Sequence, residues 1–161
     1  MHGFTSSSPA LSALLSCLVL TSCFGGEEDN GREKVLVERI LDGDTVELSD
    51  GRKVRYLGVD TPELKDDDCY AKEAKQFNES LVLLKEVELE LDENPTDMYG
   101  RTLAYVWLKT GSGERMVNEE LLLKGYARTL FIAPNHKYKS ELEAAKEAAV
   151  AAGAGLWSAC D

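Results

Sequence analysis

The sequence predicts an α+β fold: a five-stranded, partly open β-barrel accompanied by three α-helices. Short segments that alternate between apolar and polar residues predict the strands, and longer segments with apolar residues at helical spacing predict the helices. The chain has 161 residues, of which 43% are hydrophobic and 29% are charged. This length and composition suit one globular domain and leave little room for a second.

The predicted strands are bounded by turn signals. Asp50-Gly51 separates the second strand from the third, and this dipeptide between alternating segments is a strong signal for a hairpin. The fourth strand alternates with period two, so we expect its valine and two leucines to face the core. Glu86, Glu88 and Glu90 are then expected to form a solvated face. The five strands are predicted at residues 35–41, 45–48, 53–59, 86–91 and 102–108.

Three segments have the pattern of helices. The first helix follows the third strand, where apolar side chains recur every three or four residues. The second covers residues 118–124 and stops at Gly125, and the third covers residues 135–152 and ends at Gly153. Five short strands with a helix after the third are the arrangement of an OB-type barrel. The apolar positions of the first helix are Tyr70, Ala74, Phe77, Leu81 and Leu84.

Three short motifs bring acidic residues and arginines into this small domain. They are Asp-Gly-Asp-Thr at 42–45, Arg-Tyr-Leu-Gly-Val-Asp-Thr-Pro-Glu at 55–63 and Thr-Asp-Met-Tyr-Gly-Arg at 96–101. Taken singly, each has a simple structural explanation: a turn, the entry to a loop or helix, or ordinary surface charges. Their joint occurrence in this order favours a functional site.

The residue types in these motifs suit metal-assisted hydrolysis of phosphodiester bonds. A divalent ion held by two carboxylates can polarise a phosphoryl oxygen, and Asp44 and Asp60 suit that ion. The attacking water must lose a proton, for which Glu63 is the candidate base. Arginine stays charged at any working pH and presents a planar fork to phosphate oxygens. Arg55 and Arg101 are therefore candidates to clamp the phosphate.

These motifs resemble those of the thermonuclease (staphylococcal nuclease-like) family. The resemblance extends from about residue 37 to about residue 157, and it includes the run D-x-Y-G-R-x-L-A-Y at 97–105. It implies that Asp44, Asp60 and the backbone carbonyl of Thr61 hold calcium. It also implies that Asp42 is an additional acidic residue near the metal, in its outer shell.

The same resemblance assigns the remaining chemistry. It implies that Glu63 is the general base and that Arg55 and Arg101 are the two catalytic arginines. In the family, tyrosines line the nucleotide pocket, and Tyr99 matches one of them. The stretch 130–134 reads Leu-Phe-Ile-Ala-Pro and contains no tyrosine, so we expect weaker binding of the base and terminal phosphate.

The charge balance is acidic. The chain contains 18 Lys and Arg residues against 29 Asp and Glu residues, a net charge of −11. A protein that binds nucleic acid stably is expected to carry a basic surface, whereas an enzyme needs only a local positive site. The sequence therefore predicts weak and salt-sensitive substrate binding.

The N-terminus predicts export. Residues 1–22 contain no Asp, Glu, Lys or Arg, and residues 10–20 form an apolar run that is too short for a comfortable membrane span. The run ends in Leu-Thr-Ser-Cys, which resembles a bacterial lipoprotein signal with Cys23 as the lipidated residue that anchors the protein to a membrane. An ordinary cleaved secretory signal is the alternative. We expect a signal peptide at 1–22, a flexible tether at 23–34 and the folded domain at 35–161.

Cysteine parity also favours export. Cys17 would leave with the signal and Cys23 would carry lipid, which leaves Cys69 and Cys160 as an even pair. In an oxidising compartment such a pair is most simply a disulfide. It would close a loop of about 90 residues, for which the chain-entropy model gives about 4 to 5 kcal/mol of stabilisation.

Two classes of function remain open. The first is an exported calcium-dependent endonuclease acting on DNA or RNA, and the resemblance implies departure of the 5′ oxygen and products ending in 3′-phosphates. The second is a surface-tethered OB-fold binding module for oligonucleotides or other anionic polymers, with vestigial hydrolysis. The complete set of acids and arginines favours the first; the net charge and the missing tyrosines favour the second. We expect a monomer, because no long apolar stripe calls for a partner.

Overall fold

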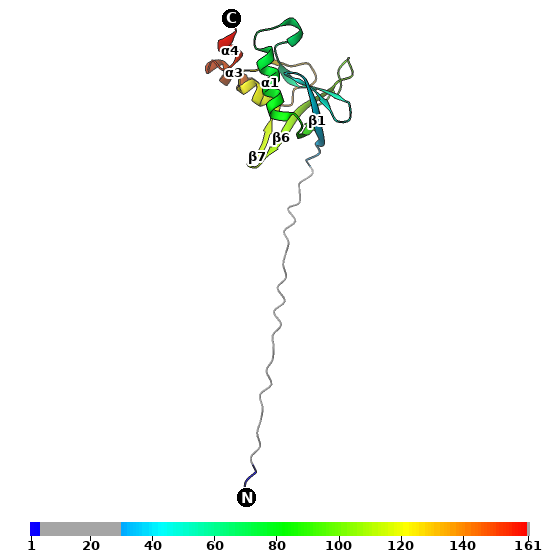
Figure 1. Ribbon diagram of the computed structural model, residues 1–161, viewed down its shortest axis with the longest axis vertical. Coiled ribbons are helices and arrows are strands. Elements are labelled where there is room, and N and C mark those ends of the chain that lie inside the picture. The colour runs from blue at the N-terminus through cyan, green and yellow to red at the C-terminus, as the bar shows by residue number, and fades with distance from the viewer. Residues whose placement is uncertain (4–29, 161) are drawn as a thin grey trace.

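The computed structural model describes residues 1–3 and 30–160 (Figure 1). Five strands form a closed, mixed barrel. Antiparallel pairing joins neighbouring strands around most of the ring, and one parallel pairing, between the third and fifth barrel strands along the chain, closes it. The predicted α+β fold with a five-stranded barrel is confirmed. The barrel strands are β1 (Glu33–Asp42), β2 (Thr45–Leu48), β3 (Lys53–Tyr56), β5 (Glu86–Glu90) and β6 (Thr102–Thr110).

Three further short strands extend this barrel. β7 (Gly113–Met116) pairs with β6, and β4 (Gly58–Asp60) forms a separate two-stranded ladder with β8 (Arg128–Leu130). The third strand, predicted as one segment over 53–59, is therefore divided into β3 and β4. Gly58 explains the division, since its φ of +75° turns the chain, and a Cβ there would lie 2.4 Å from Leu142.

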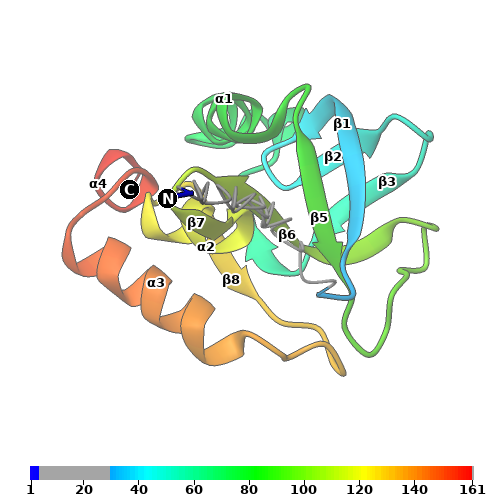
Figure 2. The ribbon, with the colours of Figure 1, turned by 90° about the horizontal axis from the view of Figure 1, so that it is seen from below.

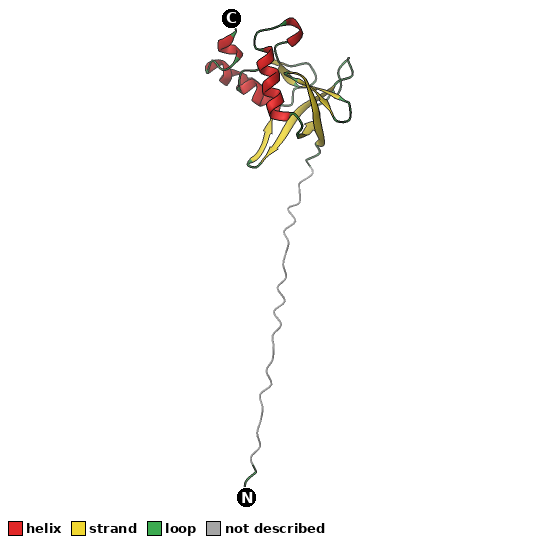
Figure 3. Ribbon diagram, viewed as in Figure 1, coloured by secondary structure: helices red, strands yellow, loops and turns green. Residues whose placement is uncertain are grey.

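The three predicted helices are present, and they lie on the opposite side of the molecule from β3 (Figures 2 and 3). The third helix begins at Lys139 and not at residue 135, because Asn135 is bound instead to the backbone of Asn94 through both its amide nitrogen and its amide oxygen. No helix within residues 1–3 and 30–160 is long and apolar enough to cross a membrane. The helices are η1 (Leu64–Asp66), α1 (Ala71–Val82), α2 (Val117–Leu123), α3 (Lys139–Ala151) and α4 (Leu156–Ala159).

The barrel interior is apolar and tightly filled. Val37, Val46, Val54, Tyr56 and Leu89 are essentially inaccessible to solvent, and α1, α2 and α3 add buried side chains at the barrel's edge. Alternation along β2, β3 and β5 produces this core, as the sequence predicted. The site described below is thus built on rigid strands and the turns that join them.

β5 differs from prediction on its outer face. Leu91 follows the strand and is exposed, while Glu88 is only 3% exposed. The expected solvated row of glutamates is therefore wrong at Glu88 and also at Glu90, which pairs with Arg32 at 2.8 Å. Asn30 donates a hydrogen bond of 2.8 Å to Glu88, so the chain before β1 covers these carboxylates.

This cover comes from the segment predicted as a tether. Residues 33 and 34 lie in β1, and the guanidinium of Arg32 stacks over Trp107 at 3.9 Å. The folded domain therefore includes residues 30–34, which overlap the predicted tether at 23–34. The predicted signal peptide, the earlier part of the tether and Cys23 lie outside the described residues, apart from residues 1–3.

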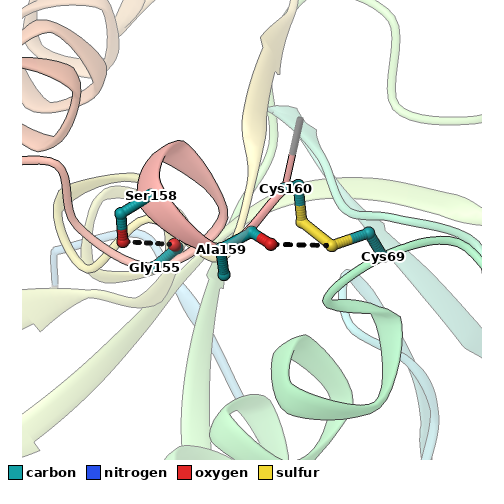
Figure 4. The surroundings of a disulfide bond; sticks show 5 residues. All are labelled: Cys69, Gly155, Ser158, Ala159 and Cys160. Carbon is teal, nitrogen blue, oxygen red and sulfur yellow. Dashed lines mark hydrogen bonds between the residues drawn. A yellow bond between two sulfur atoms is a disulfide. The ribbon is translucent and has the colours of Figure 1, made fainter.

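The structure contains the Cys69–Cys160 disulfide (Figure 4). The two Cα atoms are 5.9 Å apart, and the bond links the residues just before α1 to the end of α4 across 91 positions of sequence. The bridge therefore holds the C-terminal end of the described chain against the segment that follows η1.

Removing this bridge should destabilise the protein. We expect Cys160→Ala to lower the free energy of unfolding by as much as about 4 kcal/mol, because the unfolded chain regains the entropy of a long open loop. Thermal unfolding of the variant beside the wild type measures the effect. In the native protein both thiols should resist alkylation until a reductant is added, and free labelling of both would contradict the bridge.

Candidate active site

The turn between β1 and β2 forms one wall of the site. Asp42 ends β1, Thr45 begins β2, and Gly43 and Asp44 form the turn between them. A Cβ on Gly43 would lie 2.6 Å from Oγ1 of Thr61 and 2.8 Å from its Cβ, which is closer than such atoms pack. Glycine at this position therefore lets Thr61 approach the turn.

Asp44 is buried in that contact. Its side chain is enclosed, with the residue only 5% exposed, and Oδ2 accepts hydrogen bonds from both the backbone N–H of Thr61 at 2.8 Å and the Thr61 hydroxyl at 2.9 Å. Oδ1 accepts from the Thr45 hydroxyl at 3.0 Å. A buried carboxylate held by several donors has a fixed orientation, so Asp44 is preorganised.

Arg55 joins this carboxylate to the end of β4. Its Nη2 donates to Oδ1 of Asp60 at 2.8 Å, and its Nη1 lies 3.2 Å from Oδ2 of Asp44. Nη1 also donates to the backbone carbonyl of Val59 at 2.7 Å. One guanidinium thus bridges two acidic residues that are predicted metal ligands and is itself fixed by the main chain.

Several carboxylates lie close enough to one another around Arg55 to repel each other. Burial raises the pKa of the Asp60 carboxyl, Arg55 opposes the shift, and the charges of Asp44 and Glu63 raise the pKa further. Burial also raises the pKa of Asp42; the Gly43 N–H opposes this, and Asp44 and Glu63 again add to it. The predicted ligands, the predicted base and Asp42 therefore interact electrostatically within one small region.

Glu63 lies beside Asp60 and Thr61 at the entry to η1. Its carboxylate is about half exposed, at 45%, and lies 3.6 Å from the ammonium of Lys65. Its backbone N–H donates to Asp68 at 3.0 Å, which fixes the start of the turn. Glu63 faces a cavity of about 320 Å³, here called the Glu63 cavity. Its lining residues are Asp60, Thr61, Pro62, Glu63, Asp68, Cys69, Arg128 and Cys160.

Arg101 lies directly before β6. Its Nε donates to Asp97 at 2.7 Å, and its guanidinium lies 5.5 Å from the centre of the Tyr99 ring. Both arginines line a second, more apolar cavity of about 370 Å³, here called the Tyr99 cavity. Arg101 has no direct contact with the acidic residues around Arg55 in this structure; the two arginines meet only as walls of the same cavity.

The donor set fits a hard divalent cation. No three His, Cys, Asp or Glu side chains within the described part of the chain converge tightly enough to form a metal site by themselves. The available ligands are, however, all hard oxygens: the carboxylates of Asp44 and Asp60 and the carbonyl of Thr61. A cation between them would also offset both the burial and the repulsion from Asp44 and Glu63 that raise the pKa of Asp60.

Sequence reasoning missed two residues of this region. Asn78 on α1 is fully buried; its Oδ1 accepts from the Tyr56 hydroxyl at 3.0 Å, and its Nδ2 donates to the carbonyl of Asp42 at 3.3 Å. An available signal was its position four residues after Ala74, on the helix face that is otherwise apolar. Arg128, which lines the Glu63 cavity, follows no local pattern that marks it.

Known proteins named as nucleases are similar to most of this chain. The chain is 41% identical over 132 residues to the thermonuclease of Staphylococcus intermedius, an alignment that covers 78% of this chain and 76% of that protein. It is 41% identical over 129 residues to the thermonuclease of Staphylococcus hyicus, covering 76% and 74%. Endonuclease YncB of Bacillus subtilis is 38% identical over 133 residues, covering 77% and 61%. The model of the family described as staphylococcal nuclease homologue matches residues 53–159, and the chain belongs to that family.

Proposed function

We propose that this protein is an exported, calcium-dependent endonuclease that hydrolyses phosphodiester bonds in DNA or RNA. The observation that carries the proposal is the bridge that Arg55 makes between Asp44 and Asp60, next to the cavity that Glu63 faces. The printed names of the relatives, thermonuclease and endonuclease, support the same chemistry.

Calcium would be held by the carboxylates of Asp44 and Asp60 and by the carbonyl of Thr61. When bound, the ion would polarise a phosphoryl oxygen and supply positive charge to the reacting phosphate. Asp42 directly precedes the turn, with Oδ1 accepting from the Gly43 N–H at 2.8 Å, which suits a role in the outer shell.

The side chains supply proton transfer and the stabilisation of charge in the transition state. Glu63 is accessible from the Glu63 cavity and would take a proton from the attacking water, since no residue of the described chain holds its carboxylate in a tight ion pair. As the bond from the water oxygen to phosphorus forms, the bond from phosphorus to the 5′ oxygen would break; that oxygen takes up a proton from solvent, so the products end in a 3′-phosphate and a 5′-hydroxyl. Arg55 and Arg101 present planar donors toward the Tyr99 cavity and would stabilise the charge that grows on the phosphoryl oxygens.

The Tyr99 cavity suits the nucleoside beside the reacting phosphate. Tyr99 is 77% exposed, and Leu130 and Ile132 add apolar surface to the same walls. Base stacking on an exposed aromatic ring needs no particular sequence, which fits a nuclease of broad specificity. The net charge of −11 makes binding salt-sensitive and transient.

Export and anchoring through Cys23 complete the proposal. The Cys69–Cys160 disulfide suits an oxidising compartment, and the apolar run at 10–20 supplies a signal. The protein would act as a monomer tethered to a membrane by lipid on Cys23, with nucleic acid as its substrate.

Lysine variants of the two arginines test whether the protein is an enzyme or a binding module. Arg55→Lys and Arg101→Lys keep the charge but lose the planar fork, so each should lower the single-turnover rate of cleavage at least about a hundredfold. The affinity for single-stranded DNA, measured separately by fluorescence anisotropy in calcium, should change much less. Arg115→Lys, on β7 and outside both cavities, is the matched control.

A binding module gives the opposite pattern. The wild type would then show no metal-dependent cleavage, and both lysine variants would weaken capture of the oligonucleotide. Cleavage at the wild-type rate in both variants would remove these arginines from the mechanism.

A further inference from the structure

Arg128 occupies a defined place in the Glu63 cavity. It begins β8, which pairs antiparallel with β4 so that Arg128 lies directly opposite Asp60 in the ladder. Its side chain lines the same cavity as Glu63. A residue that is distant in sequence is thus held beside the reacting groups by backbone pairing.

Arg128 forms no ion pair with a carboxylate of residues 30–160. Each of the other six arginines within residues 30–160 has a carboxylate oxygen within 4.0 Å, whereas Arg128 contacts only the face of Trp157, at 5.1 Å. The carboxylates of this cavity have other partners: Asp60 pairs with Arg55, Glu63 with Lys65, and Asp68 accepts the Glu63 N–H. A guanidinium without a carboxylate partner in the described part of the chain is available to an anion from outside.

The ladder also connects the two cavities. At one end of the ladder, the pair Asp60 and Arg128 lines the Glu63 cavity. At the other end, two residues away on each strand, the pair Gly58 and Leu130 lines the Tyr99 cavity. Two residues of a strand span about 6.6 Å, a distance that neighbouring phosphates of one strand of nucleic acid can readily bridge. A strand of nucleic acid that occupies the Tyr99 cavity and passes Arg55 would therefore reach Arg128 next.

We propose that Arg128 binds the phosphate next to the scissile one, on the side of the Glu63 cavity, and so forms a second phosphate subsite. This inference rests on the proposed function and deepens it, because it sets a minimum length for a good substrate. Arg128 acts here as a binding residue; the bond-breaking step stays with Glu63, the two arginines Arg55 and Arg101, and the proposed calcium ligands.

Two substrates test this subsite. A dinucleotide carries only the scissile linkage, whereas an octanucleotide of thymidine also carries the neighbouring phosphates. Arg128→Gln should raise KM for the octanucleotide about tenfold, leave kcat within about twofold, and leave cleavage of the dinucleotide unchanged. The slope of log affinity for the octanucleotide against log salt should become shallower by about 0.7, the value for one lost contact to a single strand.

Control variants separate this contact from general effects of charge. Arg115→Gln removes the same charge from β7, outside both cavities, and should leave both substrates and the salt slope unchanged. Arg128→Lys should keep the salt slope and recover part of the affinity, because the charge remains and only the fork is lost.

Binding in a Glu63→Gln background distinguishes failure of the subsite from failure of the proposed function. If the protein is no nuclease, the affinity of the octanucleotide still reports on Arg128. Equal affinity and an equal salt slope with and without Arg128→Gln in that background would overturn the subsite, as would equal losses on the dinucleotide and the octanucleotide. A loss confined to the octanucleotide supports it.

Discussion

Replacing Glu63 by glutamine should lower kcat for single-stranded DNA by about a thousandfold while leaving substrate affinity nearly unchanged. The amide has almost the same shape but cannot accept the proton of the attacking water, and general-base catalysis contributes about 10²- to 10⁴-fold in enzymes. The structure supports this separation, since Glu63 is half exposed and its only ion pair within residues 30–160, to Lys65 at 3.6 Å, lies at the surface. Single-turnover cleavage beside anisotropy binding measures the two quantities.

Glu73→Gln is the matched control for this variant. Glu73 is an exposed residue in the first turn of α1 and lines neither cavity, so its replacement should leave kcat unchanged. A Glu63→Gln protein that cleaves at the wild-type rate would show that another group activates the water.

Asp44→Asn should weaken calcium binding at least about a hundredfold and abolish most activity with it. Affinity for calcium follows the number of charged oxygen ligands, and Asp44 is the more deeply buried of the two carboxylates. The amide can still accept hydrogen bonds from Thr61, so the turn should stay folded. Isothermal titration of calcium into both proteins gives the affinities directly, with no need for turnover.

Thermal unfolding supplies a second measurement of the same effect. Calcium should raise the melting temperature of the wild type, because a ligand that binds only the folded state stabilises it, and it should leave that of Asp44→Asn almost unchanged. Asp50→Asn, in the exposed turn between β2 and β3, is the control and should bind calcium normally. Equal calcium affinity in Asp44→Asn and the wild type would exclude Asp44 as a ligand.

The barrel was predictable because its signals are local. Alternation along β2 and β5 and the Asp50-Gly51 turn follow from neighbouring residues, and the structure places Val87 and Leu89 in the core accordingly. The fate of Glu88 was not predictable in this way. It is covered by Asn30, 58 positions earlier in the chain, so its burial depends on a contact that no strand pattern contains.

The site shows the same division. Asp44 and Asp60 could be predicted as metal ligands because each belongs to a short motif, and the structure brings them to the same guanidinium. Arg128 was missed because its place is set by pairing with Asp60 across the β4–β8 ladder. That ladder forms because the backbone turns at Gly58 and divides the predicted third strand into β3 and β4. Non-local pairing of this kind leaves no periodic trace in the sequence.

The most direct test of the proposed nuclease is cleavage of single-stranded DNA by the unmodified protein, followed first in calcium, then with excess chelator, and again after calcium is restored. We predict cleavage into fragments with 3′-phosphate ends in calcium, its loss in chelator and its recovery on restoration. Cleavage at full rate in chelator, or tight binding of DNA without any cleavage in calcium, would contradict a calcium-dependent nuclease.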